Sequence, residues 1–217
     1  RYVGILEYVY EGITFYFIDN ESYFWGDKPY GDWYYDLEKF SFFSQAALSA
    51  LPVIGWRPDV IHCHDWQAAL AAIYLKTIYC KRVEYQFIRA VFTIHNIEYQ
   101  GQYSPDILGG VFGIPANYRY LLEYGDCINL MKAAIECCEM FSTVSPTYAR
   151  EIKNAEYAHG LQDEIRRNEF KLRGILNGID VNSYNPATDS ALFAPFDGND
   201  LGGKAVCKAE LQKMLGL

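Results

Sequence analysis

The sequence predicts an α/β domain with a doubly wound, mostly parallel sheet and helices on both faces. Short apolar runs rich in β-branched and aromatic residues alternate with segments in which alanine and leucine recur every three or four residues. Such alternation indicates right-handed βαβ units. Two of the apolar runs end abruptly in histidine followed by an acid or an amide, at His64-Asp65 and His95-Asn96. Because ligands bind at the carboxyl ends of parallel strands, we expect these two ends to share one crevice.

The elements follow in order along the chain. Five strands are predicted, at residues 14–19, 60–63, 90–94, 140–144 and 172–176. Helices are predicted at residues 40–48, 66–79, 129–138, 161–168 and 203–215. Asp36 opens the first helix and Pro52 stops it, and a further helix starts at Ser145-Pro146, with serine as its cap. The segments 20–33 and 101–125 show no clear period and are interpreted as long loops.

Composition narrows the class of protein. The 217 residues are 51% hydrophobic and 17% aromatic, enough for one substantial core or two small ones. A net charge of −8 argues against a nucleic-acid partner, whose phosphates need clustered lysine and arginine. No run of 18 apolar residues is present, so no membrane partner is expected. The 19 tyrosines and 4 tryptophans indicate either an aromatic core or a sugar-binding face.

The cysteines and the chain ends give two further expectations. None of the six cysteines is paired in a CxxC spacing, so we expect reduced thiols and a cytoplasmic protein. The chain begins at Arg1 without a methionine and finishes in a helix-like segment, so we expect a piece of a longer protein.

His62, His64 and Asp65 first suggest a metal site. Strand alternation places the two histidines on one face, with the carboxylate just beyond the strand. A complete site needs three or four ligands, and the only other histidines are His95 and His159. A metal-dependent hydrolase is therefore the weaker alternative, and a buried, hydrogen-bonded His62 is the simpler interpretation.

Asp65 and His95 are also candidates for binding a sugar. Asp65 stands directly before a helical period, where it either caps the helix or bonds a substrate hydroxyl, and these roles are compatible. His95 beside Asn96 offers donors and acceptors that suit hydroxyl groups, although a structural bond at the sheet edge is the alternative. Asn177-Gly178 is typical of a tight turn.

Five motifs, read together, identify a family resemblance. They are KFSFFSQAAL at 39–48, HCHDWQ at 62–67, FTIHNIEYQG at 92–101, TVSPTYARE at 143–151, and GILNGID at 174–180 with NPATD at 185–189. In this order they resemble the starch and glycogen synthases, which are retaining glucosyltransferases of the two-domain GT-B class. The bacterial glycogen synthases are the most similar in pattern.

The resemblance implies that residues 1–217 form a single Rossmann-like, amino-terminal, acceptor-side domain, with 200–217 approaching a linker. It implies a parent enzyme that transfers glucose from ADP-glucose to the non-reducing end of an α-1,4-glucan with retention, without a cofactor. The family's first strand, its glycine-rich loop and its nucleotide-sugar domain would lie outside this chain, so the chain alone is expected to be inactive. The family is cytoplasmic in bacteria and plastidial in plants and algae.

The resemblance also implies roles for single residues. His95 matches the histidine that contacts the donor glucose, and with Asp65 it is the expected catalytic pair. The expected substrate-binding residues are Asn96, Asn177, Tyr34 and Trp66, although the Trp66 ring is also interpretable as core. A stand-alone glucan-binding module is the alternative from the binding class, beside the metal-dependent hydrolase.

Overall fold

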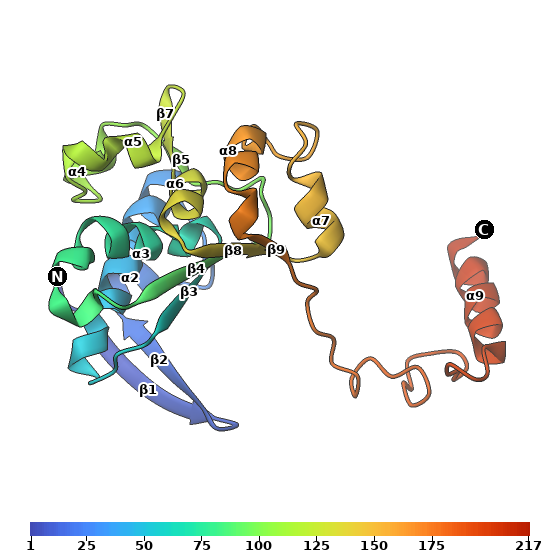
Figure 1. Cartoon of the computed structure of the whole chain (residues 1–217). Coiled ribbons are helices and arrows are strands. Elements are labelled where there is room, and N and C mark those ends of the chain that lie inside the picture. Colours follow the sequence, from blue (N-terminus) through green and yellow to red (C-terminus); the bar gives the residue numbers. More distant parts are fainter. The chain divides into compact units, whose positions relative to one another are not determined.

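A four-stranded, fully parallel sheet lies at the centre of residues 1–176 (Figure 1). The computed structural model describes all 217 residues, which divide into two units, Arg1–Leu176 and Asn177–Leu217. The strands of the sheet are, in spatial order, β3 (Val60–His64), β4 (Arg89–Ile94), β8 (Met140–Thr143) and β9 (Leu172–Gly174). The predicted α/β fold with a mostly parallel sheet is confirmed. The expected single domain over residues 1–217 stays a prediction, because the chain divides into these two units.

The α-helices of the first unit include those that connect the parallel strands, and the last helix of the chain lies in the second unit. The helices are α1 (Glu21–Phe24), α2 (Trp33–Val53), α3 (Asp65–Thr77), α4 (Ile107–Gly110), α5 (Arg119–Leu122), α6 (Leu130–Cys137), α7 (Pro146–Glu151), α8 (Gln162–Arg167) and α9 (Gly202–Leu215). Helix α3 contacts β3, β4, α2 and α6, so it is the centre of the core. The Ser145 hydroxyl caps α7 by accepting the Tyr148 N–H at 2.8 Å, as predicted.

One face of the sheet supplies the apolar core. Strand alternation directs Cys63, Phe92 and Phe141 to the same side, and each is at most 2% exposed. Helix α3 packs on this face with the small side chains of Ala69 and Ala72, which are also fully buried and allow the helix to approach the sheet closely. Burying one such phenylalanine contributes about 1.5–3 kcal/mol. The opposite face carries polar side chains, among them exposed histidines, and it leads to the candidate site.

The strand predicted at 14–19 exists but lies outside the parallel sheet. It is β2 (Ile13–Asp19), which pairs antiparallel with β1 (Gly4–Tyr10) in a separate two-stranded sheet. The two residues that join them, Glu11 and Gly12, have φ of 49° and 78°. Positive φ at both positions is the geometry of the tightest hairpin turns. The prediction of a fifth parallel strand is therefore wrong, because a two-residue turn brings this run to its neighbour in sequence.

The predicted loops contain short elements. Residues 101–125 hold α4, α5 and two-residue strands, and the structure adds a small antiparallel sheet of β5 (Gln102–Tyr103), β6 (Glu123–Tyr124) and β7 (Cys127–Asn129). Apolar side chains hold this segment down, since Phe112 and Ile114 are at most 2% exposed. Elements of two to four residues are too short to show a period, which is why the sequence indicated a loop.

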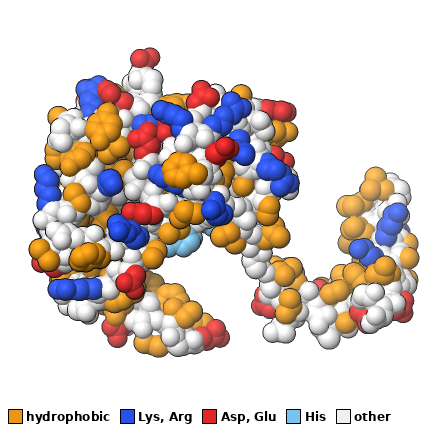
Figure 2. Space-filling view, in the orientation of Figure 1, with side chains coloured by type: hydrophobic (Ala, Val, Ile, Leu, Met, Phe, Trp, Pro, Cys, Tyr) orange, Lys and Arg blue, Asp and Glu red, His pale blue; other side chains and the backbone are white.

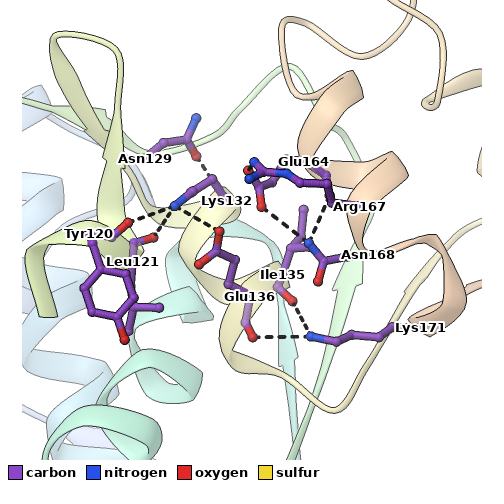
Figure 3. A network of polar contacts seen from close by, with 10 residues as sticks. All are labelled: Tyr120, Leu121, Asn129, Lys132, Ile135, Glu136, Glu164, Arg167, Asn168 and Lys171. Atoms are coloured by element: carbon purple, nitrogen blue, oxygen red, sulfur yellow. Dashed lines mark hydrogen bonds and ion pairs between the residues drawn. The ribbon is translucent and has the colours of Figure 1, made fainter.

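A buried polar network joins α5, α6 and α8 (Figure 3). Lys132 of α6 is 6% exposed, and its Nζ donates to the carbonyl oxygens of Tyr120 and Leu121 at 3.1 and 2.9 Å. These carbonyls end α5, so a buried cation satisfies acceptors that a short helix leaves free. The same Nζ lies 3.1 Å from Oε1 of Glu136.

Glu164 of α8 is the buried acid of this network, with 3% exposure. It forms an ion pair with Arg167, and its Oε1 accepts from Asn168 Nδ2 at 3.3 Å. Burial, and next the neighbouring Glu136, raise the pKa of the Glu164 carboxyl. The network therefore links α6 to α5 through the hydrogen bonds of Lys132, and α6 to α8 through the effect of Glu136 on the Glu164 carboxyl.

The second unit contains α9, which Gly216 ends with φ of 70°. The tight turn predicted at Asn177-Gly178 is wrong, because the turn residues are 181–184. There, Oδ1 of Asp180 accepts the N–H groups of Asn182 and Ser183 at 2.9 and 3.0 Å. An Asp side chain thus makes the turn that the Asn-Gly pair was expected to make. No helix in either unit has the length and apolar character needed to cross a membrane.

Candidate active site

The carboxyl ends of β3 and β4 bring Asp65 and His95 together. The two strands pair in parallel with His64 opposite Thr93, so the residues that follow each strand emerge at the same edge. Oδ1 of Asp65 accepts the backbone N–H of His95 at 2.8 Å. The shared edge predicted from the two histidine-tipped runs is therefore present.

Asp65 has an unusual backbone conformation. Its φ is 55°, in the left-handed region that Asp tolerates better than most residues but at a cost. The predicted capping role of its side chain is wrong, because His64 is the N-cap residue of α3 and no side chain caps this helix. The carboxylate bonds the neighbouring strand end instead. Its Oδ2 makes no hydrogen bond within the protein, so it is available to an outside donor.

Three histidines form a row on the polar face of the sheet. Nδ1 of His64 lies 2.9 Å from Nε2 of His95, and the rings of His62 and His64 lie 4.2 Å apart between centroids. Nε2 of His62 bonds Oγ1 of Thr93 at 2.7 Å, and that hydroxyl bonds Oγ of Ser142 at 2.7 Å. Figure 2 shows that histidine side chains reach the surface of the molecule. With Thr93 and Ser142 included, the row reaches across β3, β4 and β8.

From the residues alone, His62 and His64 were candidate metal ligands, with an interior role as the simpler interpretation of His62. The expectation of a buried His62 is wrong, since its side chain is exposed, but it is hydrogen-bonded as expected. The signal that was missed is the strand pairing itself. Residues two apart on β3 share a face, and parallel pairing places that face beside Thr93 of β4, with His95 directly after the strand.

The environment disfavours positive charge on two of these rings. Loss of hydration of the ring beside its neighbours, and next the charge of His95, lower the pKa of His62. The pKa of His64 is lowered by burial and then by His62 and His95, and Asp65 partly offsets this. Both imidazoles are thus held toward the uncharged form, in which each ring has one N–H donor and one acceptor nitrogen.

No three His, Cys, Asp or Glu side chains are grouped as metal ligands in this structure. The nearest arrangement is the histidine row, in which His64 and His95 turn ring nitrogens toward each other. The metal-dependent hydrolase therefore has no ligand set to support it.

The expected substrate-binding residues lie in different surroundings. Asn96 is exposed just after β4, and its Oδ1 accepts the Glu98 N–H at 2.9 Å, which shapes the turn beside His95. Tyr34 is 60% exposed in the first turn of α2. Asn177 is the first residue of the second unit. Sugar contacts by these three residues stay predictions.

Trp66 differs from these, because it is only 6% exposed. Its ring packs among Trp33, Phe40 and Tyr103, with centroids 5.3–6.3 Å away. The chain passes so close that a Cβ on Gly101 would lie 3.0 Å from the indole. This burial favours the core interpretation of Trp66, and a sugar contact by its ring is not supported. As the residue after Asp65, it anchors the strand–helix junction in the apolar core.

A cavity of about 360 Å³ lies elsewhere, among residues 23–39. Its lining includes Trp25 and Tyr30, which are 83% and 55% exposed. Neither Asp65 nor His95 lines it. The structure therefore has two separate features that suit a sugar, the hydrogen-bonding edge of the sheet and an aromatic hollow.

Comparison with known proteins gives consistent matches. The family described as the starch synthase catalytic domain matches residues 1–167. The glycogen synthase of Streptococcus uberis is 47% identical over 220 residues, and that of Lachnospira eligens is 45% identical over 222 residues. Each match covers 100% of this chain and 46% of the relative. The chain therefore spans about half the length of the curated relatives that it matches.

A solved structure agrees in fold. It is the catalytic domain of Starch Synthase IV from Arabidopsis thaliana, bound to ADP and acarbose. The TM-score is 0.79 at 41% sequence identity, over 99% of this chain and 45% of that chain.

Proposed function

Because this chain belongs to the starch synthase catalytic domain family, we propose that it forms the amino-terminal, acceptor-side half of a glycogen or starch synthase. The whole protein transfers glucose from ADP-glucose to the non-reducing end of an α-1,4-glucan with retention. The observation that carries the proposal is the Asp65–His95 contact at the shared edge of β3 and β4, within motifs that resemble this family. The ADP and acarbose bound by the Arabidopsis relative support a nucleotide donor and a glucan-like acceptor.

In this proposal Asp65 and His95 orient the transferred glucose. Oδ1 of Asp65 is occupied by the backbone of residue 95, which leaves Oδ2 to accept a sugar hydroxyl. On His95, Nε2 is occupied by His64, which leaves Nδ1 for a second hydroxyl. Two fixed contacts to one sugar restrict its position, and a displacement of about 1 Å can cost on the order of 100-fold in rate. Asn96, Tyr34 and Asn177 are proposed as further sugar contacts.

The departing ADP needs positive charge that this site does not offer. The side chains that are hydrogen-bonded in the row from His62 to Ser142 include no lysine or arginine. Fixed cations that stabilise a leaving pyrophosphate are a large part of such catalysis. We therefore propose that activity depends on the part of the relatives' length that this chain does not span, and that the 217 residues alone are inactive. A cytoplasmic location is part of the same proposal.

Glucosyl transfer tests the proposal directly. The full-length protein should incorporate radiolabelled glucose from ADP-glucose into glycogen, and the chain of 217 residues should not. Incorporation by the chain alone would contradict the dependence on the remaining half. No incorporation by the full-length protein, with any nucleotide-glucose donor, would contradict the proposed function itself.

The role of His95 has its own test in the full-length protein. His95→Ala should lower kcat by about 100-fold while the glucan KM changes by less than about threefold, because the ring is proposed to act on the donor glucose. His159→Ala is the matched control, since this exposed histidine lies outside the row. Equal losses in kcat and glucan affinity would contradict the assignment of His95 to the donor sugar.

A glucan-binding module is the second candidate, and the aromatic hollow favours it. Rings such as Trp25 and Tyr30 stack on the apolar faces of sugars and need no catalytic partner. Calorimetry with maltoheptaose on the 217-residue chain tests this candidate, with Trp25→Ala and Tyr30→Ala as separate variants. Binding that both variants leave unchanged would exclude a stacking site at these rings.

A further inference from the structure

The hydrogen bond between two imidazoles restricts both rings. Nδ1 of His64 and Nε2 of His95 lie 2.9 Å apart. Between uncharged rings, one of these nitrogens must carry the proton and the other must offer its lone pair. The tautomer of one ring therefore determines the tautomer of the other. Because Nε2 of His95 is occupied, Nδ1 is its only ring nitrogen left for an outside partner.

His64 is itself held in place by the rest of the row. Its ring lies against the ring of His62, at 4.2 Å between centroids. His62 is anchored by Thr93, which bonds Ser142, and these two residues are each 7% exposed. Buried hydroxyls on neighbouring strands have little freedom to reorganise, since an unpaired buried hydroxyl is costly. The row thus gives His64 a support that reaches across β3, β4 and β8.

We propose that His64 is a positioning residue, which fixes the ring orientation of His95 and couples the tautomer of His95 to its own through this bond. His64 does not touch the sugar in this proposal. It ensures that His95 presents one defined nitrogen, Nδ1, to a hydroxyl of the transferred glucose. Which nitrogen of a histidine is protonated is commonly set by the bond that the other nitrogen makes. The identity of the sugar rests on the proposed function, whereas the bond and its effect on the tautomer do not.

Nuclear magnetic resonance of the 217-residue chain with ¹⁵N-labelled histidine tests the bond. The chain has only four histidines, and His159, which lies outside the row, serves as an internal reference. In His64→Ala the ¹⁵N shifts of both His95 nitrogens should move toward those of an unrestrained tautomer mixture, while those of His159 stay constant. In His64→Gln, whose amide can still bond Nε2 of His95, the shifts should stay near wild type.

The result that would overturn the proposal is an unchanged His95 spectrum in a folded His64→Ala chain, with folding checked by circular dichroism. If that variant does not fold, the wild-type chain decides. A ¹⁵N–¹⁵N coupling between Nδ1 of His64 and Nε2 of His95 is expected. Averaged tautomers on both rings, with no coupling, would contradict the proposal without any variant.

Kinetics of the full-length protein test the consequence for catalysis. His64→Ala should lower kcat by about 10- to 100-fold and change the glucan KM by less than about twofold, and His64→Gln should recover most of the loss. An unchanged kcat in His64→Ala would overturn the positioning role. A wild-type protein without transferase activity would instead contradict the proposed function, and the spectroscopic result would still decide the bond.

Discussion

The carboxylate of Asp65 bonds the backbone of His95, with 2.8 Å between Oδ1 and the amide nitrogen. The bond joins the carboxyl ends of two parallel strands, where β3 passes into α3 and β4 passes into a loop. Because the Asp65 side chain holds the backbone of His95, it also fixes the position from which the His95 imidazole extends. The geometry of the site therefore depends on Asp65 even before any substrate binds.

Loss of this carboxylate should weaken the fold. Asp65→Ala is expected to lower the free energy of unfolding by about 1–2 kcal/mol, because a backbone N–H loses its charged acceptor. Asp65→Asn is the matched control, since asparagine keeps an acceptor oxygen and tolerates a φ of 55°. Urea unfolding of the three chains measures the difference. An alanine variant as stable as wild type would show that the bond adds nothing.

Alanine substitutions at Trp66 and Tyr34 should differ in their effect on the free energy of unfolding, because one ring is buried and the other is exposed. Trp66→Ala is expected to cost about 3–5 kcal/mol of unfolding free energy, because a 6% exposed indole leaves a cavity among other rings. Tyr34→Ala removes a ring that is 60% exposed and should change stability by less than about 0.5 kcal/mol. Urea unfolding measures both. A mild effect of the tryptophan change would contradict its assignment to the core.

Glu164 should make stability depend on pH. Burial, and next Glu136, raise the pKa of its carboxyl in the folded chain, so the folded state binds this proton more tightly than the unfolded state. The stability that follows is present at acidic pH and is lost as the pH rises through the raised pKa. Glu164→Gln cannot titrate. The stability of wild type relative to this variant should therefore fall between about pH 5 and about pH 8.

Unfolding in urea at the two pH values measures this change for Glu164→Gln. Asp163→Asn is the control, because this carboxylate lies on the same helix with 80% of its side chain exposed. A difference between wild type and Glu164→Gln that is the same at both pH values would refute the prediction.

The cysteines should differ sharply in reactivity. Burial raises the pKa of Cys63, Cys137 and Cys138 to about 12, so almost no thiolate forms at pH 8. Cys80 is exposed. Iodoacetamide should therefore modify Cys80 first, and the three buried thiols only after unfolding, as followed by mass spectrometry of peptides. Equal rates at Cys80 and Cys63 in the folded chain would be the contrary outcome.

Pattern alone was sufficient for the parallel strands and for their order with the main helices. Pattern failed where the question was which strand pairs with which, because the period of apolar residues within one strand does not identify its partner. The run at 14–19 is a strand, as predicted, but the positive φ of Glu11 and Gly12 turns it onto β1 and away from the parallel sheet. The short elements within 101–125 were missed because two to four residues carry no period.

The candidate site likewise has features that the residue pattern predicted and features that depend on how the strands pair. The positions of Asp65 and His95 after two strands were predictable from the residues, because apolar runs with polar ends indicate strand termini in a parallel sheet. The bond of Asp65 to the backbone of residue 95 in place of a cap on α3, and the bond of His64 to the His95 ring, were not predictable before the strands were paired. Periodicity describes one element at a time, whereas a hydrogen bond between side chains depends on the register and twist that set two elements side by side.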